Sequence, residues 1–93
     1  MMERKIYQVI WGVETEKDLK KVDKNTIRKL KAQTNEVLSK NPQAKVKSIK
    51  KLSGDWEGFW RYRWGDYRVI YKIVEEKVLV FIVKVGNRNK IYD

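Results

Sequence analysis

Apolar residues in the first half of the chain follow a strand period and then a helical one. Residues 5–13 alternate loosely between apolar and polar positions and predict a first strand. Thr15 is placed to cap a short helix, and Asp23 or Asn25 to cap a longer one. The longer helix is expected to end at Asn41, because the residue before a proline avoids the α region. Its apolar stripe holds Ile27, Leu30, Val37 and Leu38.

The second half of the chain has the pattern of successive strands. Strands are predicted at residues 46–52, 59–64, 67–74 and 78–85. Gly65-Asp66 suits a two-residue hairpin turn of type II′, and Gly86 is expected to break the last strand. One strand, two helices and a run of strands predict a single α+β domain over residues 1–93. In this domain a two-helix hairpin packs on one face of a four- to five-stranded, mostly antiparallel sheet.

The composition is strongly basic and lacks two reactive residue types. The 93 residues include 22 Lys and Arg against 12 Asp and Glu, for a formal net charge of +10 that attracts polyanions, nucleic acid first. Cysteine and histidine are both absent, which excludes a disulfide scaffold, a thiol nucleophile and a cysteine-based zinc site. The longest apolar run, residues 78–83, is far too short to span a membrane, and no signal peptide is expected. We therefore expect a soluble cytoplasmic protein.

The turn at Gly65-Asp66 determines which residues of its two strands lie opposite each other. Trp64 is expected to pair with Tyr67, and Arg63 with Arg68. Side chains alternate along each strand, so aromatic residues share one face and arginines the other. The aromatic face holds Trp60, Tyr62, Trp64, Tyr67, Val69 and Tyr71. This face suits the apolar stripe of the helices, and a platform for stacking bases is the alternative.

The opposite face of the hairpin holds Arg61, Arg63 and Arg68. Two like charges directly opposite each other destabilise a hairpin by roughly 0.2–1 kcal/mol. A phosphate bound between the two guanidiniums would relieve this repulsion. The structural alternative is neutralisation by a nearby carboxylate: Asp55, Glu57 or Asp66. If the last two strands pair, the segment after residue 85 emerges beside Arg68 and adds Arg88 and Tyr92.

Four motifs resemble the RelE/ParE superfamily of toxins from bacterial and archaeal toxin–antitoxin systems. They are Leu52-Ser-Gly54, Trp60-Arg-Tyr-Arg63, Gly65-Asp-Tyr-Arg-Val-Ile-Tyr71 and Val85-Gly-Asn-Arg88 followed by Ile91-Tyr92. The resemblance implies a ribosome-dependent messenger-RNA endonuclease. In that reaction the 2′-hydroxyl attacks the adjacent phosphate, without a metal or another cofactor. It also implies a cognate antitoxin, the ribosome and mRNA as partners, with operator DNA as a candidate ligand of the toxin–antitoxin complex, and no membrane.

The resemblance also implies which residues do the chemistry. Catalytic roles fall on Arg61, Arg63, Arg68, Arg88 and Tyr92. RNA-binding roles fall on Lys50, Lys51, Lys90 and Asn87. Many relatives carry lysine at positions 61 and 63 and histidine at position 87. Because arginine is not readily deprotonated, it suits a phosphate clamp better than a general base. Lys51 and Glu57 are the candidate bases, with Lys50 and Tyr92 as further options.

Two other functions remain open from the sequence. The first is a ParE-like protein that inhibits DNA gyrase without being a nuclease. The second is a basic RNA-binding module that lacks catalytic activity. The convergent arginines and Tyr92 favour the nuclease, because a gyrase inhibitor has no need of them. For a nuclease, we expect the arginine face to be concave and open to solvent, with Arg88 and Tyr92 at its rim.

Overall fold

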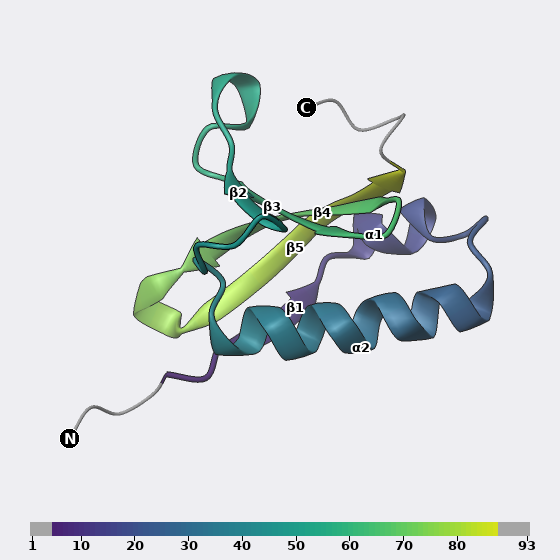
Figure 1. Cartoon of the computed structure of the whole chain (residues 1–93), viewed down its shortest axis with the longest axis horizontal. Coiled ribbons are helices and arrows are strands. Elements are labelled where there is room, and N and C mark those ends of the chain that lie inside the picture. The colour runs from purple at the N-terminus through teal and green to yellow at the C-terminus, as the bar shows by residue number, and fades with distance from the viewer. Residues whose placement is uncertain (1–4, 88–93) are drawn as a thin grey trace.

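The computed structural model describes residues 5–87 as a five-stranded sheet with two helices (Figure 1). The strands are β1 (Gln8–Trp11), β2 (Ile49–Lys51), β3 (Trp60–Trp64), β4 (Tyr67–Val74) and β5 (Leu79–Asn87). The helices are α1 (Val13–Asp18) and α2 (Lys24–Lys40), and two 3-10 turns are η1 (Gly54–Trp56) and η2 (Glu75–Lys77). The sheet order is β1-β5-β4-β3-β2, and only β1 and β5 run parallel. The predicted α+β class and largely antiparallel sheet are confirmed.

The long helix begins and ends where the sequence predicts. The Asp23 carboxylate caps α2 by accepting a hydrogen bond from the Thr26 backbone N–H at 3.0 Å, which decides between the two expected caps. Asn41 ends the helix and donates its backbone N–H to the Val37 carbonyl. Neither helix of residues 5–87 combines the length and the apolar content that a membrane span requires.

The cap predicted for the short helix is wrong. Gly12 is the N-cap of α1, and Thr15 lies inside the helix, only 1% exposed. The Thr15 hydroxyl donates to the Gly12 carbonyl at 2.6 Å instead of capping a free N–H. Glycine is required at this cap because a Cβ on Gly12 would lie 2.9 Å from the Ile82 carbonyl oxygen of β5.

Several strand boundaries also differ from those predicted. β2 is shorter than expected because residues 46–48 form a turn, in which the Ile49 backbone N–H bonds to the Val46 carbonyl. β5 is longer, because its pairing with β4 continues through Gly86 to Asn87. Gly86 therefore does not break the strand: it lies opposite Arg68 within the ladder.

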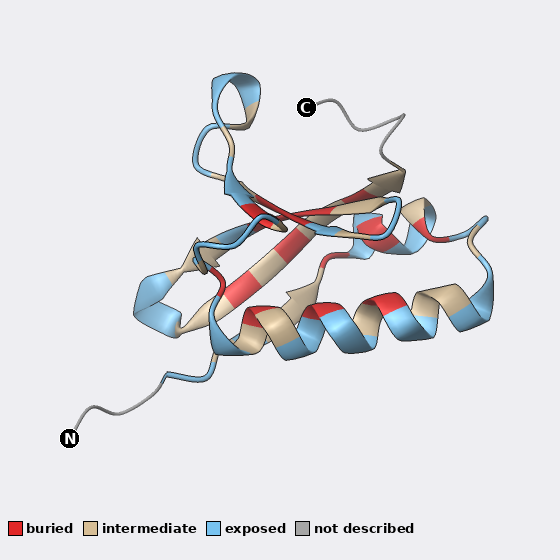
Figure 2. Ribbon diagram, viewed as in Figure 1, coloured by how far each residue is buried: buried red, intermediate tan, exposed pale blue. Residues whose placement is uncertain are grey.

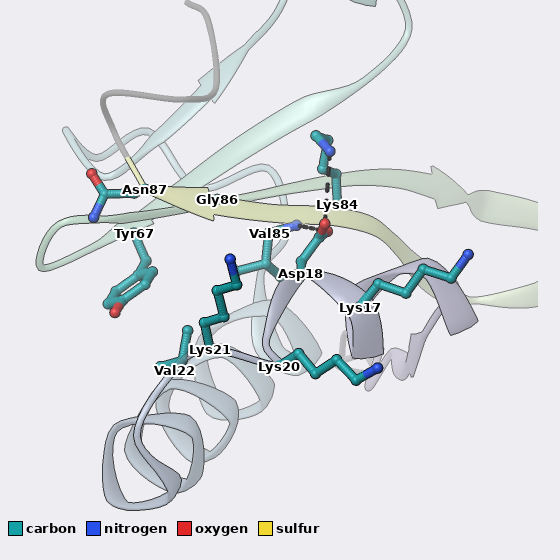
Figure 3. Close-up of a pocket in the computed structure, with 10 residues that line it drawn as sticks. All are labelled: Lys17, Asp18, Lys20, Lys21, Val22, Tyr67, Lys84, Val85, Gly86 and Asn87. Carbon is teal, nitrogen blue, oxygen red and sulfur yellow. Dashed lines mark hydrogen bonds and ion pairs between the residues drawn. The ribbon is translucent and has the colours of Figure 1, made fainter.

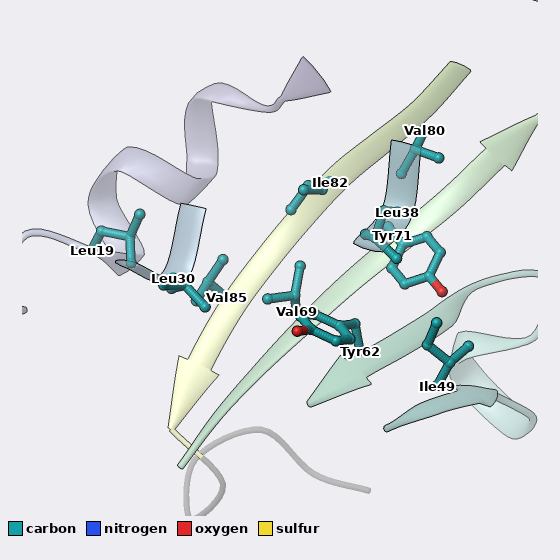
Figure 4. Close-up of a cluster of buried hydrophobic side chains, with 10 residues drawn as sticks. All are labelled: Leu19, Leu30, Leu38, Ile49, Tyr62, Val69, Tyr71, Val80, Ile82 and Val85. Carbon is teal, nitrogen blue, oxygen red and sulfur yellow. The ribbon is translucent and has the colours of Figure 1, made fainter. Parts of the chain in front are cut away.

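The core lies between the helices and the aromatic face of the sheet (Figures 2 and 4). The buried cluster comprises Leu19, Leu30 and Leu38 from the helical region with Ile49, Tyr62, Val69, Tyr71, Val80, Ile82 and Val85 from the sheet. Tyr71 is fully buried, and its hydroxyl donates to the Pro42 carbonyl at 2.7 Å. This arrangement identifies the aromatic face as the core-facing side, and neither helix of residues 5–87 covers the other face of the sheet.

Candidate functional site

The face of the sheet opposite the helices carries a group of basic residues, which we call the basic face. Arg63 lies opposite Arg68, Arg61 opposite Lys50, and Lys84 opposite Ile70. With Lys72 the basic face comprises Lys50, Arg61, Arg63, Arg68, Lys72 and Lys84. None of the five strands contains an Asp or Glu. The strands themselves therefore supply only positive charge to this face.

The predicted register of the hairpin is confirmed residue for residue. Trp64 pairs with Tyr67, and Arg63 pairs with Arg68. Gly65 has a φ of +58°, whereas the φ of Asp66 is not positive, as a type II′ turn requires. Arg63 is exposed and Arg68 is half-buried. Within residues 5–87, no carboxylate forms an ion pair with Arg63.

The expectation that all three arginines are open to solvent is wrong for Arg61. Its residue surface is only 8% exposed, and its Nη2 lies 3.4 Å from the Lys47 carbonyl oxygen. Lys47 precedes β2, the edge strand that pairs with β3, so the guanidinium is held against the sheet edge. Its charge also lowers the pKa of the Tyr71 phenol, against the larger effect of burial, which raises that pKa.

Other candidate residues do not join the basic face. Lys51 pairs with Trp60, and Asn87 pairs with Tyr67, so both positions belong to the helix-facing side of the sheet. Lys50, by contrast, lies on the basic face. Glu57 is exposed in the loop that follows η1. Three further candidates lie outside the described residues: Arg88, Lys90 and Tyr92.

A basic pocket of about 590 Å³, absent from the sequence-based prediction, lies between α1 and the adjoining ends of β4 and β5 (Figure 3). Its lining includes Lys17, Lys20, Lys21, Tyr67, Lys84 and Asn87. Asp18 lines it too, but its Oδ2 accepts a hydrogen bond from the Val85 backbone N–H at 2.9 Å. Its Oδ1 lies 3.7 Å from the Lys84 ammonium. The run of lysines around Asp18 was the available sequence signal, but it has the usual pattern of a solvated helix face.

The described part of the chain offers no cluster of three carboxylates that could hold a metal ion. The same residues include no histidine or cysteine. The guanidinium and ammonium groups of the basic face can bind and polarise a phosphate electrostatically.

A protein-family comparison matches most of the chain. Residues 9–92 match the family model described as the ParE toxin of the type II toxin–antitoxin system parDE. No curated protein sequence matches the chain significantly.

Solved structures with this fold include several toxin–antitoxin complexes. A chain of the RelBE2 complex from Mycobacterium tuberculosis is 26% identical with a TM-score of 0.81, covering 92% of this chain and 95% of that one. The archaeal RelE–RelB complex from Pyrococcus horikoshii is 28% identical with a TM-score of 0.73, covering 92% and 99%. The E. coli RelBE complex is 26% identical with a TM-score of 0.67, covering 87% and 95%.

Proposed function

The chain belongs to the ParE toxin family, within the RelE/ParE superfamily of toxin–antitoxin toxins, and on this premise we propose that it is a ribosome-dependent messenger-RNA endonuclease. The observation that carries the proposal is the direct pairing of Arg63 with Arg68 on a sheet face whose strands contain no acidic residue. Folding alone does not favour such a pair, because like charges opposite each other repel. A phosphodiester bound between the two guanidiniums would remove the repulsion.

In the proposed reaction the RNA supplies its own nucleophile. The 2′-oxygen of one nucleotide bonds to the adjacent phosphorus, and the bond from phosphorus to the 5′-oxygen breaks. The 2′-proton passes to a base, and the departing 5′-oxygen takes up a proton. The products are a 2′,3′-cyclic phosphate and a 5′-hydroxyl end. The downstream fragment should therefore accept phosphate from a polynucleotide kinase without prior phosphatase treatment.

The arginines act on the charge that develops at the phosphate. As the new bond forms, negative charge grows on the non-bridging oxygens, and a guanidinium already in position stabilises it. Arg63 and Arg68 take this role, with Arg88 and Tyr92 assigned to the same site by sequence resemblance. Arginine stays protonated, so the base is another group. Lys50 is the candidate on the basic face, and Glu57 is the candidate from the neighbouring loop.

The second proposed partner is an antitoxin. The three solved complexes described above each pair a toxin with its antitoxin. A chain with net charge +10 attracts an acidic, partly disordered segment that becomes ordered on binding. We expect this segment to cover the basic face and its binding to weaken as salt rises. Binding that is insensitive to salt would contradict an electrostatic mode.

Primer extension on ribosome-bound message tests the nuclease directly. The purified toxin should produce new 5′ ends in a translated message, seen as shortened extension products, and none in the same message without ribosomes. Cleavage of both samples alike would show a nuclease that does not need the ribosome, and cleavage of neither would refute the proposal.

Inhibition of DNA gyrase is the second candidate, favoured by the ParE description of the matching family model. A supercoiling assay with purified gyrase separates the two functions. Loss of supercoiling together with intact message would support the gyrase inhibitor and refute the nuclease. If neither assay responds and RNA still binds, the chain is an inactive RNA-binding module.

A further inference from the structure

We propose that the pocket between α1 and the ends of β4 and β5 binds one nucleotide of single-stranded RNA, beside the phosphate bound on the basic face. This inference rests on the proposed function, because it takes RNA as the ligand. It assigns a second contact to that RNA, on the helix-facing side of the sheet (Figure 3).

The charge of the pocket favours a phosphate. Lys17, Lys20 and Lys21 form no ion pair with any carboxylate of residues 5–87. The one acidic residue in the lining, Asp18, already contacts the Val85 N–H and the Lys84 ammonium. The lining thus contains four lysines against one engaged carboxylate, and a mobile anion is the natural counterion.

The opposite wall of the pocket favours a base. The Tyr67 ring lines the pocket on the side across from Lys21, and it is half-buried rather than sealed in the core (Figure 3). Val22 and Val85 add apolar surface. An aromatic ring beside lysines is the combination that single-stranded nucleic acid uses, with a base stacked and its phosphate bound. The volume of about 590 Å³ lies within the usual range for small-ligand pockets.

The pocket and the basic face meet at one end of the sheet. Lys84 belongs to both, since it lines the pocket and lies opposite Ile70 on the basic face. Tyr67 and Arg68 are neighbours on β4 and project to opposite faces. Gly86 lies opposite Arg68, and without a side chain it raises no barrier between the two sites. An RNA strand that leaves Arg68 can therefore cross the sheet end at Gly86.

An acidic protein segment is the competing ligand, and the aromatic wall argues against it. A carboxylate would use the lysines, but it brings no aromatic ring to stack against Tyr67. A nucleotide uses both walls of the pocket.

The test compares two triple variants of the full-length chain with equal changes in charge. One replaces Lys17, Lys20 and Lys21 with alanine. The matched control replaces Lys29, Lys45 and Lys77, all exposed and all outside the pocket lining. Fluorescence anisotropy measures binding of a labelled, unstructured RNA of about 12 nucleotides, a length typical of single-strand sites, over a series of salt concentrations.

The pocket variant should bind more weakly, and its salt dependence should be shallower by about 0.7 in log–log slope for each phosphate that the lysines no longer neutralise. The control should keep the wild-type slope. Tyr67→Leu should weaken binding by about fivefold or more with the slope unchanged, and Tyr67→Phe should retain binding. Thermal melts identify any variant that fails to fold.

Equal losses of affinity in the two triple variants would overturn the inference, because net charge alone would explain them. So would a pocket variant that binds RNA normally and loses only its acidic antitoxin segment. Failure of the proposed function looks different: the wild-type chain would leave ribosome-bound message intact whatever the pocket binds.

Discussion

The carboxylate of Asp18 accepts a hydrogen bond from the backbone N–H of Val85 at 2.9 Å, which joins α1 to the edge of β5. β1 pairs with β5 only as far as Ile82, so Val85 lies on a stretch of edge that β1 does not reach. A side chain here takes the place of a missing strand. It fixes the end of β5 that leads toward Gly86, where the basic face and the basic pocket meet.

Replacing Asp18 should therefore destabilise the fold. Asp18→Ala leaves the Val85 N–H without its acceptor, and the free energy of unfolding should fall by about 1–3 kcal/mol. Asp18→Asn keeps an amide oxygen as acceptor and should lose less. Urea denaturation measures both, with Glu14→Ala on the exposed side of the same helix as a control expected within about 0.5 kcal/mol of wild type. An Asp18→Ala variant as stable as the control would contradict the assignment.

Arg68→Ala should lower RNA cleavage far more than it lowers stability. Losing one pre-placed donor to the developing phosphate charge typically reduces the rate by roughly 10²–10³. Stability should change far less than the rate, because Arg68 lies outside the buried core cluster and its removal opens no cavity there. Arg68→Lys should recover only part of the rate, since an ammonium lacks the bidentate fork. Single-turnover cleavage on programmed ribosomes, beside thermal melts, gives both quantities. If Arg68→Ala cleaves at the wild-type rate, Arg68 does not belong to the site. Arg88→Ala should lower cleavage in the same way as Arg68→Ala.

Arg61→Ala should do what Arg68→Ala does not, and destabilise the protein. Arg61 is 8% exposed and bonds the Lys47 carbonyl, so its removal leaves a void and a carbonyl without its donor. We expect a loss of about 1–3 kcal/mol in the free energy of unfolding. Arg63→Ala, at an exposed position on the same strand, is the matched control and should change stability by less than about 0.5 kcal/mol. Equal stability of the two variants would show that Arg61 has no structural role.

Alkaline pH should destabilise the fold through its buried tyrosines. Burial raises the pKa of the Tyr71 phenol above its ordinary value of 10.0, and burial also raises the pKa of Tyr62. The folded state thus holds each phenol proton more strongly than the unfolded state does. The stability that each phenol contributes is fully present below pH 10. Above that pH the unfolded phenol ionises first, and stability falls by up to about 1.4 kcal/mol per pH unit for each such group.

Tyr71→Phe is the variant that tests this pH dependence. It should reduce the steepness of the alkaline loss, measured by urea denaturation between neutral and alkaline pH. It should also lower stability at neutral pH by about 1–3 kcal/mol, because the Pro42 carbonyl loses its donor. An alkaline slope identical to that of wild type would assign the effect to other groups.

Features set by neighbouring residues were predictable from the sequence. The Gly65-Asp66 turn determines the pairing of Arg63 with Arg68 because a two-residue loop leaves one register. Asp23 and Pro42 likewise act on residues within a few positions of themselves. The placement of the arginines and the aromatic residues on opposite faces of the hairpin could therefore be predicted by counting along two strands.

Features set by distant residues were not predictable. The burial of Arg61 depends on the path of the chain at Lys47, which no local pattern reveals. The continuation of β5 through Gly86 depends on pairing with β4, which outweighed the tendency of glycine to interrupt a strand. The basic pocket is formed by parts of the chain that are far apart in sequence, and the hydrogen bond in its wall joins Asp18 and Val85, 67 positions apart.

The parallel pairing of β1 with β5 has a consequence for the order in which the protein is made. Gln8 lies beside Leu79, so the first strand leaves the ribosome some seventy residues before its partner. Closing so long a loop is slow compared with forming a hairpin, and β1 has no partner in the sheet until β5 exists. Gly12, the N-cap of α1, bonds to Ile82 of β5, and Asp18 of α1 bonds to Val85 of the same strand. The packing of α1 against the sheet therefore also depends on β5 having been made. During synthesis the nascent chain therefore carries an unpaired apolar strand, and β5, the last strand of residues 5–87, completes the sheet.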